Sequence, residues 1–209
     1  MPIILFYFDF ASPYAYVAFH QLPQTLGGMA WQVQYRPVAQ PRLRPAPGDL
    51  DLAATSLARR QDGAQCHMQG LAAQHRLPLR WPAVYPFEST AWLHMALAAS
   101  PHGQPGRHVC ETLFNAIWQH GHNPDDSTVQ QQAWHDATAL LPVVRNVPDQ
   151  QLQQELLRLE QAARAHGVWD VPSFVLMPQD ETGGAPEIFC GVESLPMLRE
   201  AVQARQLPA

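Results

Sequence analysis

The sequence of 209 residues is long enough for one large domain or two small ones, and with 46% apolar residues it can bury a substantial core. Its formal charge is −5, and because no basic tract or stripe stands out, we do not expect a protein that binds nucleic acid. No run approaches the roughly 20 apolar residues that span a bilayer, and the N-terminus lacks the features of a signal peptide. We therefore expect a cytoplasmic protein without a membrane segment.

The start of the chain predicts a strand, a helix and a second strand. Residues 3–10 form a nearly continuous apolar run, which is typical of a strand buried on both faces of a sheet. The run stops at a Ser-Pro pair, and Pro13 suits the first position of a helix that we expect to continue over 14–26. Alternating apolar and polar residues over 31–38 predict the next strand.

The rest of the chain predicts helices, then two short strands and a final helix. The dense prolines of 36–50 predict a long irregular connection or lid with little secondary structure. Helical patterns then follow over 52–76, 87–99, 105–120, 128–141 and 149–166. Strands are predicted over 171–177 and 186–191, and an amphipathic helix over 195–206. This order predicts a small sheet domain interrupted by an inserted helical domain.

The cysteines argue against a disulfide framework. Cys66, Cys110 and Cys190 are widely spaced and odd in number, and no C-x-x-C pair occurs. His120 and His122 lack a third ligand at a known spacing, so we expect no metal site.

Three stretches, taken together, resemble one group of proteins. They are FYFDFASPYAYVA (6–18), LFNAIWQHG (113–121) and GVWDVPSFVL (167–176). The chain resembles the DsbA-type thioredoxin-like fold and, within it, the 2-hydroxychromene-2-carboxylate isomerases and kappa-class glutathione transferases. The resemblance implies an α/β protein with a thioredoxin-like domain over 1–48 and 167–209, an inserted all-α-helical domain over 49–166, and a homodimer.

Ser12 is the candidate catalytic residue. The redox members of this fold have two cysteines where this chain has the sequence Ser-Pro-Tyr-Ala, and dithiol exchange needs both sulfurs. The resemblance instead implies that the Ser12 hydroxyl holds the thiolate of bound glutathione. Lowering a thiol pKa from about 8.5 to about 6.5 takes roughly 2.7 kcal/mol, which a charged hydrogen bond and a helix N-terminus supply together. An isolated Ser-Pro pair more often only caps a helix.

Four further residues are implied in glutathione binding. The resemblance makes the bond between Val171 and Pro172 a candidate for the cis form. Both backbone groups of Val171 are expected to be free to pair, like a strand, with the cysteinyl part of a peptide thiol. Glu193 and Ser194 stand where the family usually has Asp and Arg. Glu193 is expected to pair with the γ-glutamyl ammonium, and Ser194 to cap the last helix and help hold the carboxylate.

A second, aromatic substrate is implied between the sheet domain and the helical insert. Candidates to contact it are Pro13 and Tyr14 at the Ser-Pro turn, and the aromatic residues Trp81, Tyr85, Phe87, Trp118 and Trp169. Most aromatic residues at helical spacing belong to a core, so packing is the alternative for each. Asp9, within the first apolar strand, is either a buried group with a partner near the site or the exposed residue of a strand covered on one face.

The resemblance implies a glutathione-dependent isomerase. Such an enzyme adds the glutathione thiolate reversibly to an unsaturated aromatic keto acid, so that a former double bond can rotate. The alternatives are a kappa-like glutathione transferase, a non-catalytic binding module, and a thiol/disulfide oxidoreductase-like protein that would have to use one of its three cysteines.

Overall fold

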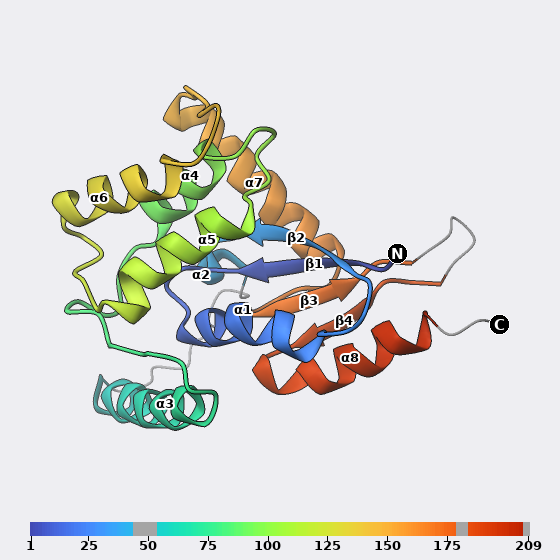
Figure 1. The fold of residues 1–209 in the computed structure, drawn as a ribbon. Helices are drawn as coiled ribbons and strands as arrows, with labels where there is room; N and C mark the ends of the chain where they lie inside the picture. The colour runs from blue at the N-terminus through green and yellow to red at the C-terminus, as the bar shows by residue number, and fades with distance from the viewer. Residues whose placement is uncertain (44–53, 179–183, 207–209) are drawn as a thin grey trace.

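A mixed four-stranded sheet forms the centre of the molecule (Figure 1). The computed structural model describes residues 1–43, 54–178 and 184–206. The strands lie in the order β2-β1-β3-β4, and their bounds are β1 Ile3–Phe8, β2 Gln32–Pro37, β3 Ser173–Leu176 and β4 Glu187–Cys190. β1 pairs in parallel with β2 and antiparallel with β3, and β3 pairs antiparallel with β4. The sheet therefore joins the two ends of the chain.

Helices connect and follow the strands. α1 (Pro13–Thr25) links β1 to β2, and α8 (Leu195–Ala204) follows β4 after the 3₁₀ turn η2 (Val192–Ser194). The segment between β2 and β3 contains α2 (Gln40–Leu43), α3 (Ala54–Gln74), α4 (Thr90–Ala98), α5 (Arg107–Phe114), the π-helical turn η1 (Asn115–Gln119), α6 (Ser127–Thr138) and α7 (Asp149–Ala165). The predicted fold class, a thioredoxin-like α/β fold with inserted helices, is confirmed. The predicted domain boundary between 48 and 49 lies outside the described residues.

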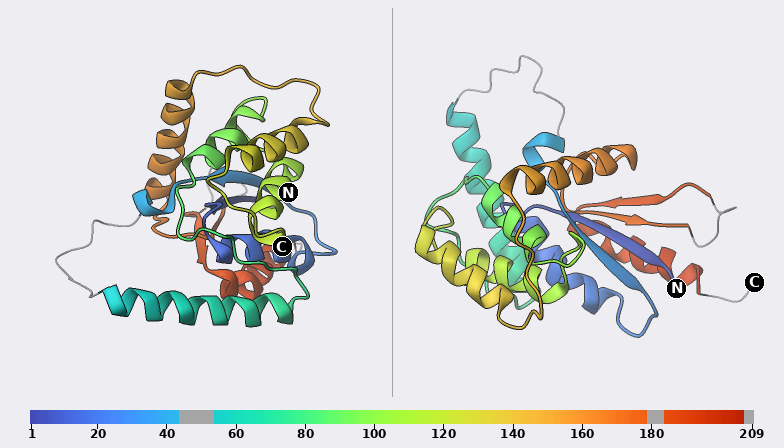
Figure 2. Two further views of the ribbon diagram at one scale, coloured as in Figure 1. Left: turned by 90° about the vertical axis from the view of Figure 1, so that its left-hand side faces the viewer. Right: turned by 90° about the horizontal axis from the view of Figure 1, so that it is seen from above.

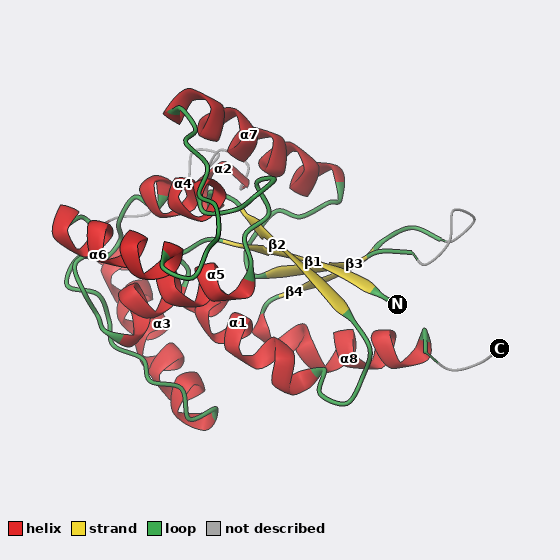
Figure 3. Ribbon diagram, turned by 45° about the horizontal axis from the view of Figure 1, so that its top comes forward, coloured by secondary structure: helices red, strands yellow, loops and turns green. Residues whose placement is uncertain are grey.

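The helices form layers on the two faces of the sheet. α1 and α8 cover one face and α7 the other, as Figures 1 and 3 show. α4, α5 and α6 gather beyond the end of the sheet, and α3 lies beside α1 (Figure 2). Among the described helices, none combines the length and the apolar character needed to cross a bilayer.

β1 is buried on both faces, as its apolar run predicts. Because side chains alternate along a strand, Phe6 and Phe8 face α1 and the helical segment, whereas Leu5 and Tyr7 face the layer of α7. The first of these two cores continues from the sheet into the inserted helices. Phe114 of α5 lies 5.4 Å from Phe8 between ring centroids. The sheet and the helical segment therefore share one core.

Two local predictions need correction. The end of β2 at Pro37 agrees with the strand predicted over 31–38. The short helix α2 within the proline-dense segment was not expected, and 44–50 lies outside the described residues. The continuous helix expected over 105–120 is instead α5 followed by the π-helical turn η1. A second cis bond, between Tyr85 and Pro86, was not predicted.

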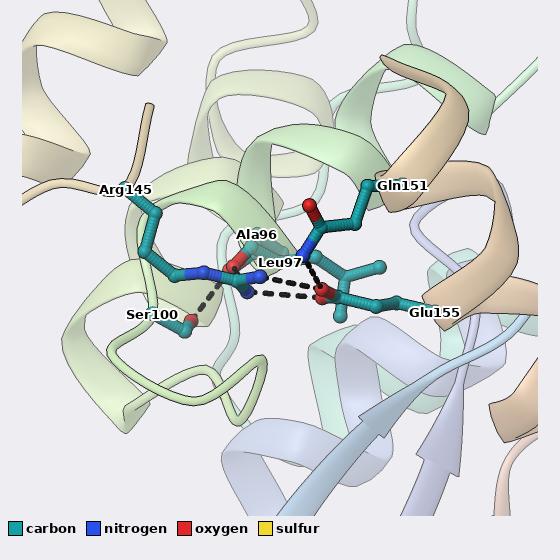
Figure 4. Close-up of polar contacts among 6 residues, drawn as sticks. All are labelled: Ala96, Leu97, Ser100, Arg145, Gln151 and Glu155. Atoms are coloured by element: carbon teal, nitrogen blue, oxygen red, sulfur yellow. Dashed lines mark hydrogen bonds and ion pairs between the residues drawn. The ribbon is translucent and has the colours of Figure 1, made fainter. Parts of the chain in front are cut away.

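Arg145 forms a clamp that joins α4 to α7 (Figure 4). Arg145 binds Glu155 of α7 through two hydrogen bonds, 2.5 Å for Nη2 to Oε1 and 2.9 Å for Nη1 to Oε2. Its Nη1 also donates to the carbonyl of Leu97 at 3.2 Å, near the C-terminal end of α4. The flat guanidinium binds both oxygens of a carboxylate while it also donates to a helix end, and a lysine ammonium cannot reproduce this planar two-point contact.

Replacing Arg145 with Ala is expected to lower the free energy of unfolding by about 1–3 kcal/mol at neutral pH, because the partly buried Glu155 loses its partner. Hydrogen bonds from Arg145 hold the pKa of Glu155 below its ordinary value. The clamp's stabilisation is therefore fully present above the ordinary value and is lost as the pH falls through the lowered one. Urea unfolding across this range should show the difference narrowing in acid.

Arg145→Lys is the matched control, since it keeps the charge but not the two-point contact. It should fall between the native protein and the Ala variant. A stability difference that is the same at neutral and acidic pH would contradict this role for the ion pair.

Candidate functional site

A cavity of about 520 Å³ opens where β1 leads into α1. Its size lies within the range of small-ligand sites. The residues that line it are Ser12, Pro13, Tyr14, Gln40, Ala64, Trp81, Tyr85, Trp169, Asp170, Val171, Pro172, Cys190 and Gly191. Eight of the residues selected from the sequence are among them. The cavity thus brings the turn before α1 together with the loop before β3, which lie far apart in the sequence.

Ser12 both caps α1 and lines the cavity. It is 3% exposed, with the extended backbone of an N-cap, and its Oγ accepts a hydrogen bond from the backbone N–H of Ala15 at 3.2 Å. Because Oγ serves there as an acceptor, its own proton is available to donate to a ligand. The positive end of the α1 dipole lies at the same place, so the site favours an anion.

Asp9 is buried and holds the turn that carries Ser12. Its two carboxylate oxygens accept hydrogen bonds from the backbone N–H of Ala11 at 2.9 Å and of Gln40 at 2.7 Å. Burial raises the pKa of Asp9, while its hydrogen bonds with Ser89, Ala11 and Gln40 oppose the rise. Of the two possibilities left by the sequence, the structure shows a buried group whose partners lie near the site.

Polar contacts attach the helical segment to the turn and to α1. Trp118 in η1 donates from Nε1 to the carbonyl of Phe10 at 2.8 Å. The hydroxyl of Tyr14 lies 3.1 Å from Nδ1 of His67 on α3, and the Tyr16 hydroxyl donates to the carbonyl of Pro78 at 2.7 Å. These contacts hold the helical segment against the turn and helix that border the cavity.

Four of the predicted aromatic residues, Trp81, Tyr85, Phe87 and Trp118, form one cluster, but only part of it reaches the cavity. Trp81 and Tyr85 line the cavity, and their ring centroids lie 5.0 Å apart. Trp118 lies behind them, 5.4 Å from Trp81, and Phe87 lies 6.4 Å from Tyr85. Trp118 and Phe87 are therefore corrected from lining residues to supporting ones, because both belong to the core. Trp169 lines the cavity from its rim and is 58% exposed.

The loop before β3 differs from the prediction in one respect. The bond between Val171 and Pro172 is cis, as expected. However, the backbone N–H of Val171 is already bonded to Oδ1 of Asp170 at 2.8 Å, so only one of its two backbone groups is free as predicted. Within the described residues, no group donates to the Val171 carbonyl. Oδ1 of Asp170 also accepts from Nε2 of Gln40 at 2.6 Å.

The segment after β4 is arranged differently from the prediction. Gly191 lines the cavity with a φ of 82°, and a side chain there would have its Cβ 2.8 Å from Oε2 of Glu193. Glu193 is exposed beside Gly191 and does not line the cavity. The Ser194 hydroxyl donates to the Gly191 carbonyl at 2.8 Å and accepts no N–H of α8. The expectation that Ser194 caps α8 is wrong, because its side chain points back to the loop.

The cysteines lie in three different environments. Burial raises the pKa of the Cys110 thiol, which makes it a poor nucleophile. Cys66 is exposed on α3, and Cys190 lines the cavity, where its Sγ lies 3.4 Å from the Ser173 hydroxyl. All three are free thiols. In the part of the chain that the structure describes, no three His, Cys, Asp or Glu side chains are arranged to hold a metal.

Comparison with known proteins identifies the family. The family described as "DSBA-like thioredoxin domain" matches residues 3–203, nearly the whole chain. This chain belongs to the DSBA-like thioredoxin domain family. The family resemblance of the three sequence stretches is thereby confirmed.

Relatives of this DSBA-like chain include proteins named 2-hydroxychromene-2-carboxylate isomerase. The one from Pseudomonas sp. (strain C18) is 30% identical over 124 residues, 59% of this chain, and the match spans only 57% of that relative. The one from Sphingobium xenophagum is 28% identical over 171 residues, 80% of this chain and 85% of the relative.

Solved structures share the fold at lower identity. A 2-hydroxychromene-2-carboxylate isomerase (HCCA isomerase) superposes with a TM-score of 0.69 and 22% identity, over 97% of this chain and 95% of that chain. The cytosolic disulfide reductase DsbM from Pseudomonas aeruginosa with GSH gives 0.57 and 12%, over 98% of each chain. At these identities the likeness shows the fold alone.

Sequence reasoning missed five of the lining residues in this DSBA-like chain: Gln40, Ala64, Asp170, Cys190 and Gly191. Asp170 directly precedes the predicted Val171, and Cys190 directly precedes the segment that contains Glu193 and Ser194. Their positions next to these residues were the available signal. For Gln40 the sequence offered no such signal, because this residue lies in a proline-dense connection. It is held at the site by hydrogen bonds from its backbone N–H to Asp9 and from its side-chain amide to Asp170.

Asp9→Asn is expected to lower the free energy of unfolding by about 1–3 kcal/mol. The buried asparagine amide would face one of the two backbone N–H groups with a donor instead of an acceptor. Chemical denaturation measures the loss. Asp126→Asn is the control, since Asp126 also accepts a backbone N–H, from Thr128, but is exposed, and asparagine is an equally good N-cap. Equal effects of the two substitutions would contradict the role assigned to Asp9.

Proposed function

We propose that this protein is a glutathione-dependent isomerase of the 2-hydroxychromene-2-carboxylate isomerase type. The observation that carries the proposal is the buried Ser12 hydroxyl, which lies at the N-terminus of α1 in a cavity also lined by the cis-proline loop. Relatives that carry the isomerase name support an enzymatic role. The HCCA isomerase of the same fold adds support at the level of architecture.

The residues present suit a tripeptide thiol. The cavity has ligand-sized volume, and the missing side chain of Gly191 leaves room beside Glu193. In the proposed roles, Ser12 donates its proton to the sulfur, and the Val171 carbonyl accepts an N–H of the peptide. Glu193 pairs with the γ-glutamyl ammonium, and Ser194 acts indirectly by fixing the loop at Gly191.

The aromatic wall suits a flat conjugated substrate. Trp81, Tyr85 and Trp169 line the cavity, as do Pro13 and Tyr14, which directly follow Ser12 in the chain. When bound, glutathione supplies a sulfur nucleophile that adds reversibly to a conjugated carbon of an unsaturated aromatic keto acid. The protein's part is to keep that sulfur ionised and to hold the acceptor beside it. Glutathione is thus regenerated at the end of each cycle, and the reaction involves no net redox change.

The working state is proposed to be a cytoplasmic homodimer. The described helices offer no bilayer span, and the similarly folded DsbM is named a cytosolic reductase. Light scattering after size-exclusion chromatography measures the mass directly, and a monomer at working concentration would contradict the dimer.

Thiol exchange at Cys190 is the second candidate, because this free thiol lines the same cavity as Ser12.

A kappa-like glutathione transferase would use the same residues as the isomerase but would give a different product. Product masses separate the isomerase from the transferase: an isomerase leaves the substrate mass unchanged, and a transferase adds glutathione to it. An exchange activity should disappear in Cys190→Ser. Glutathione binding without turnover would indicate a binding module.

Calorimetry and ultraviolet thiolate absorbance test the role of Ser12. With the native protein, bound glutathione should show an ionised thiol at neutral pH. In Ser12→Ala the pKa of the bound thiol should return toward about 8.5, because the donor is lost. The helix cap is lost as well, at a cost of about 1 kcal/mol.

Ser12→Asp separates the two roles, because an aspartate can cap α1 but repels a thiolate. It should retain the cap while abolishing the thiolate signal. Native protein that gives neither heat nor thiolate absorbance with glutathione would overturn the proposed function.

A further inference from the structure

The Asp170 carboxylate lies at the ligand-binding edge of the cis-proline loop. Its Oδ1 accepts the backbone N–H of Val171 at 2.8 Å and the side-chain amide of Gln40 at 2.6 Å. Asp170, Val171 and Gln40 all line the cavity. A charged acceptor therefore occupies the one N–H that Val171 could offer to a ligand.

The Val171 N–H and carbonyl are the two backbone groups with which an added peptide strand would pair. A peptide that adds in this way donates an N–H to the carbonyl and places its own carbonyl on the N–H. In this chain the second of these places holds Oδ1 of Asp170. A single N–H does not bond two strong acceptors well at once, so the peptide carbonyl and the Asp170 carboxylate compete for it.

Bonds that do not involve the Asp170 side chain also hold the main chain of this loop. The Ser173 hydroxyl donates to the backbone carbonyl of Asp170 at 2.7 Å, and the Gly191 N–H donates to the Pro172 carbonyl at 2.9 Å. Gln40 is held separately, through its backbone N–H on Asp9. The carboxylate can therefore leave Val171 while the main chain on both sides stays in place.

We propose that Asp170 is a specificity-determining residue that acts as an internal competitor for the peptide carbonyl of a thiol ligand. In the free protein the Asp170 carboxylate accepts a hydrogen bond from the Val171 N–H. A peptide thiol binds only by displacing the carboxylate from that N–H. This inference rests on the proposed function, since it concerns the same cavity. As a consequence, the protein should bind peptide thiols more weakly than it would without Asp170. The amide groups of the ligand should contribute less binding free energy, because one of their hydrogen bonds replaces an existing one.

The test is the affinity of glutathione and of S-methylglutathione, measured by calorimetry with native protein, Asp170→Ala and Asp170→Asn. S-methylglutathione has the same peptide carbonyls but a sulfur that cannot ionise. Asp170→Ala should bind both ligands about tenfold more tightly, because one hydrogen bond no longer has to be exchanged. Asp170→Asn keeps the side-chain shape with a neutral acceptor, and it should fall between the other two.

Glu193→Gln is the charge-matched comparison, since it removes one negative charge next to the cavity without touching Val171. It should weaken binding of both ligands. If loss of negative charge alone tightened binding, Glu193→Gln would tighten it too, and the proposal would be overturned. Unchanged or weaker binding in Asp170→Ala would also overturn it, because a purely structural residue gives that result.

The two proposals fail in different ways. If S-methylglutathione binds more tightly to Asp170→Ala but glutathione never shows an ionised thiol, the competitor role stands and the isomerase proposal falls. If the thiolate forms in native protein and Asp170→Ala leaves both affinities unchanged, the isomerase proposal stands and the competitor role falls. Absence of binding by every variant overturns both.

Discussion

The candidate site depends on the hydrogen bonds of one buried carboxylate. Asp9 stands directly after β1, and its oxygens hold the backbone N–H groups of Ala11 and Gln40. The first bond fixes the turn that carries Ser12, and the second fixes the residue whose side chain reaches Asp170. A charge is costly to bury unless donors surround it, and here the donors are the backbone groups that must be positioned. The site is therefore organised from the end of the first strand outward.

The aromatic core acts together with this polar centre. Phe8 and Phe10 pack on Phe114 of the inserted helices, and Trp118 donates to the carbonyl of Phe10. The same indole supports Trp81 and Tyr85 from behind. The aromatic wall of the cavity is thus positioned by the packing that joins the helical segment to the sheet. The position of the cavity wall and the stability of the core therefore depend on the same aromatic rings.

The sequence predicted the fold and the Ser12 turn because both leave local signals. A buried strand shows as an apolar run, and Ser-Pro before a helical pattern marks its first turn. Pairings between distant segments leave no such signal. The sequence could not show that Asp170 takes the Val171 N–H, that Ser194 turns back to Gly191, or that Trp118 lies behind the cavity wall. Each depends on the direction of a side chain, which three-dimensional packing decides.

The continuous core has a consequence for how this architecture can change. The rings of Phe8 and Phe10 are fully buried, and part of their cover comes from the inserted helices. A shortened chain without that insert would expose aromatic surface to water next to the turn that carries Ser12, and such surface promotes aggregation. Exchange of the insert for that of a relative would have to preserve the interlocking faces of both parts. Changes in what the cavity accommodates are therefore easier to make around Trp169 than by replacing the whole insert.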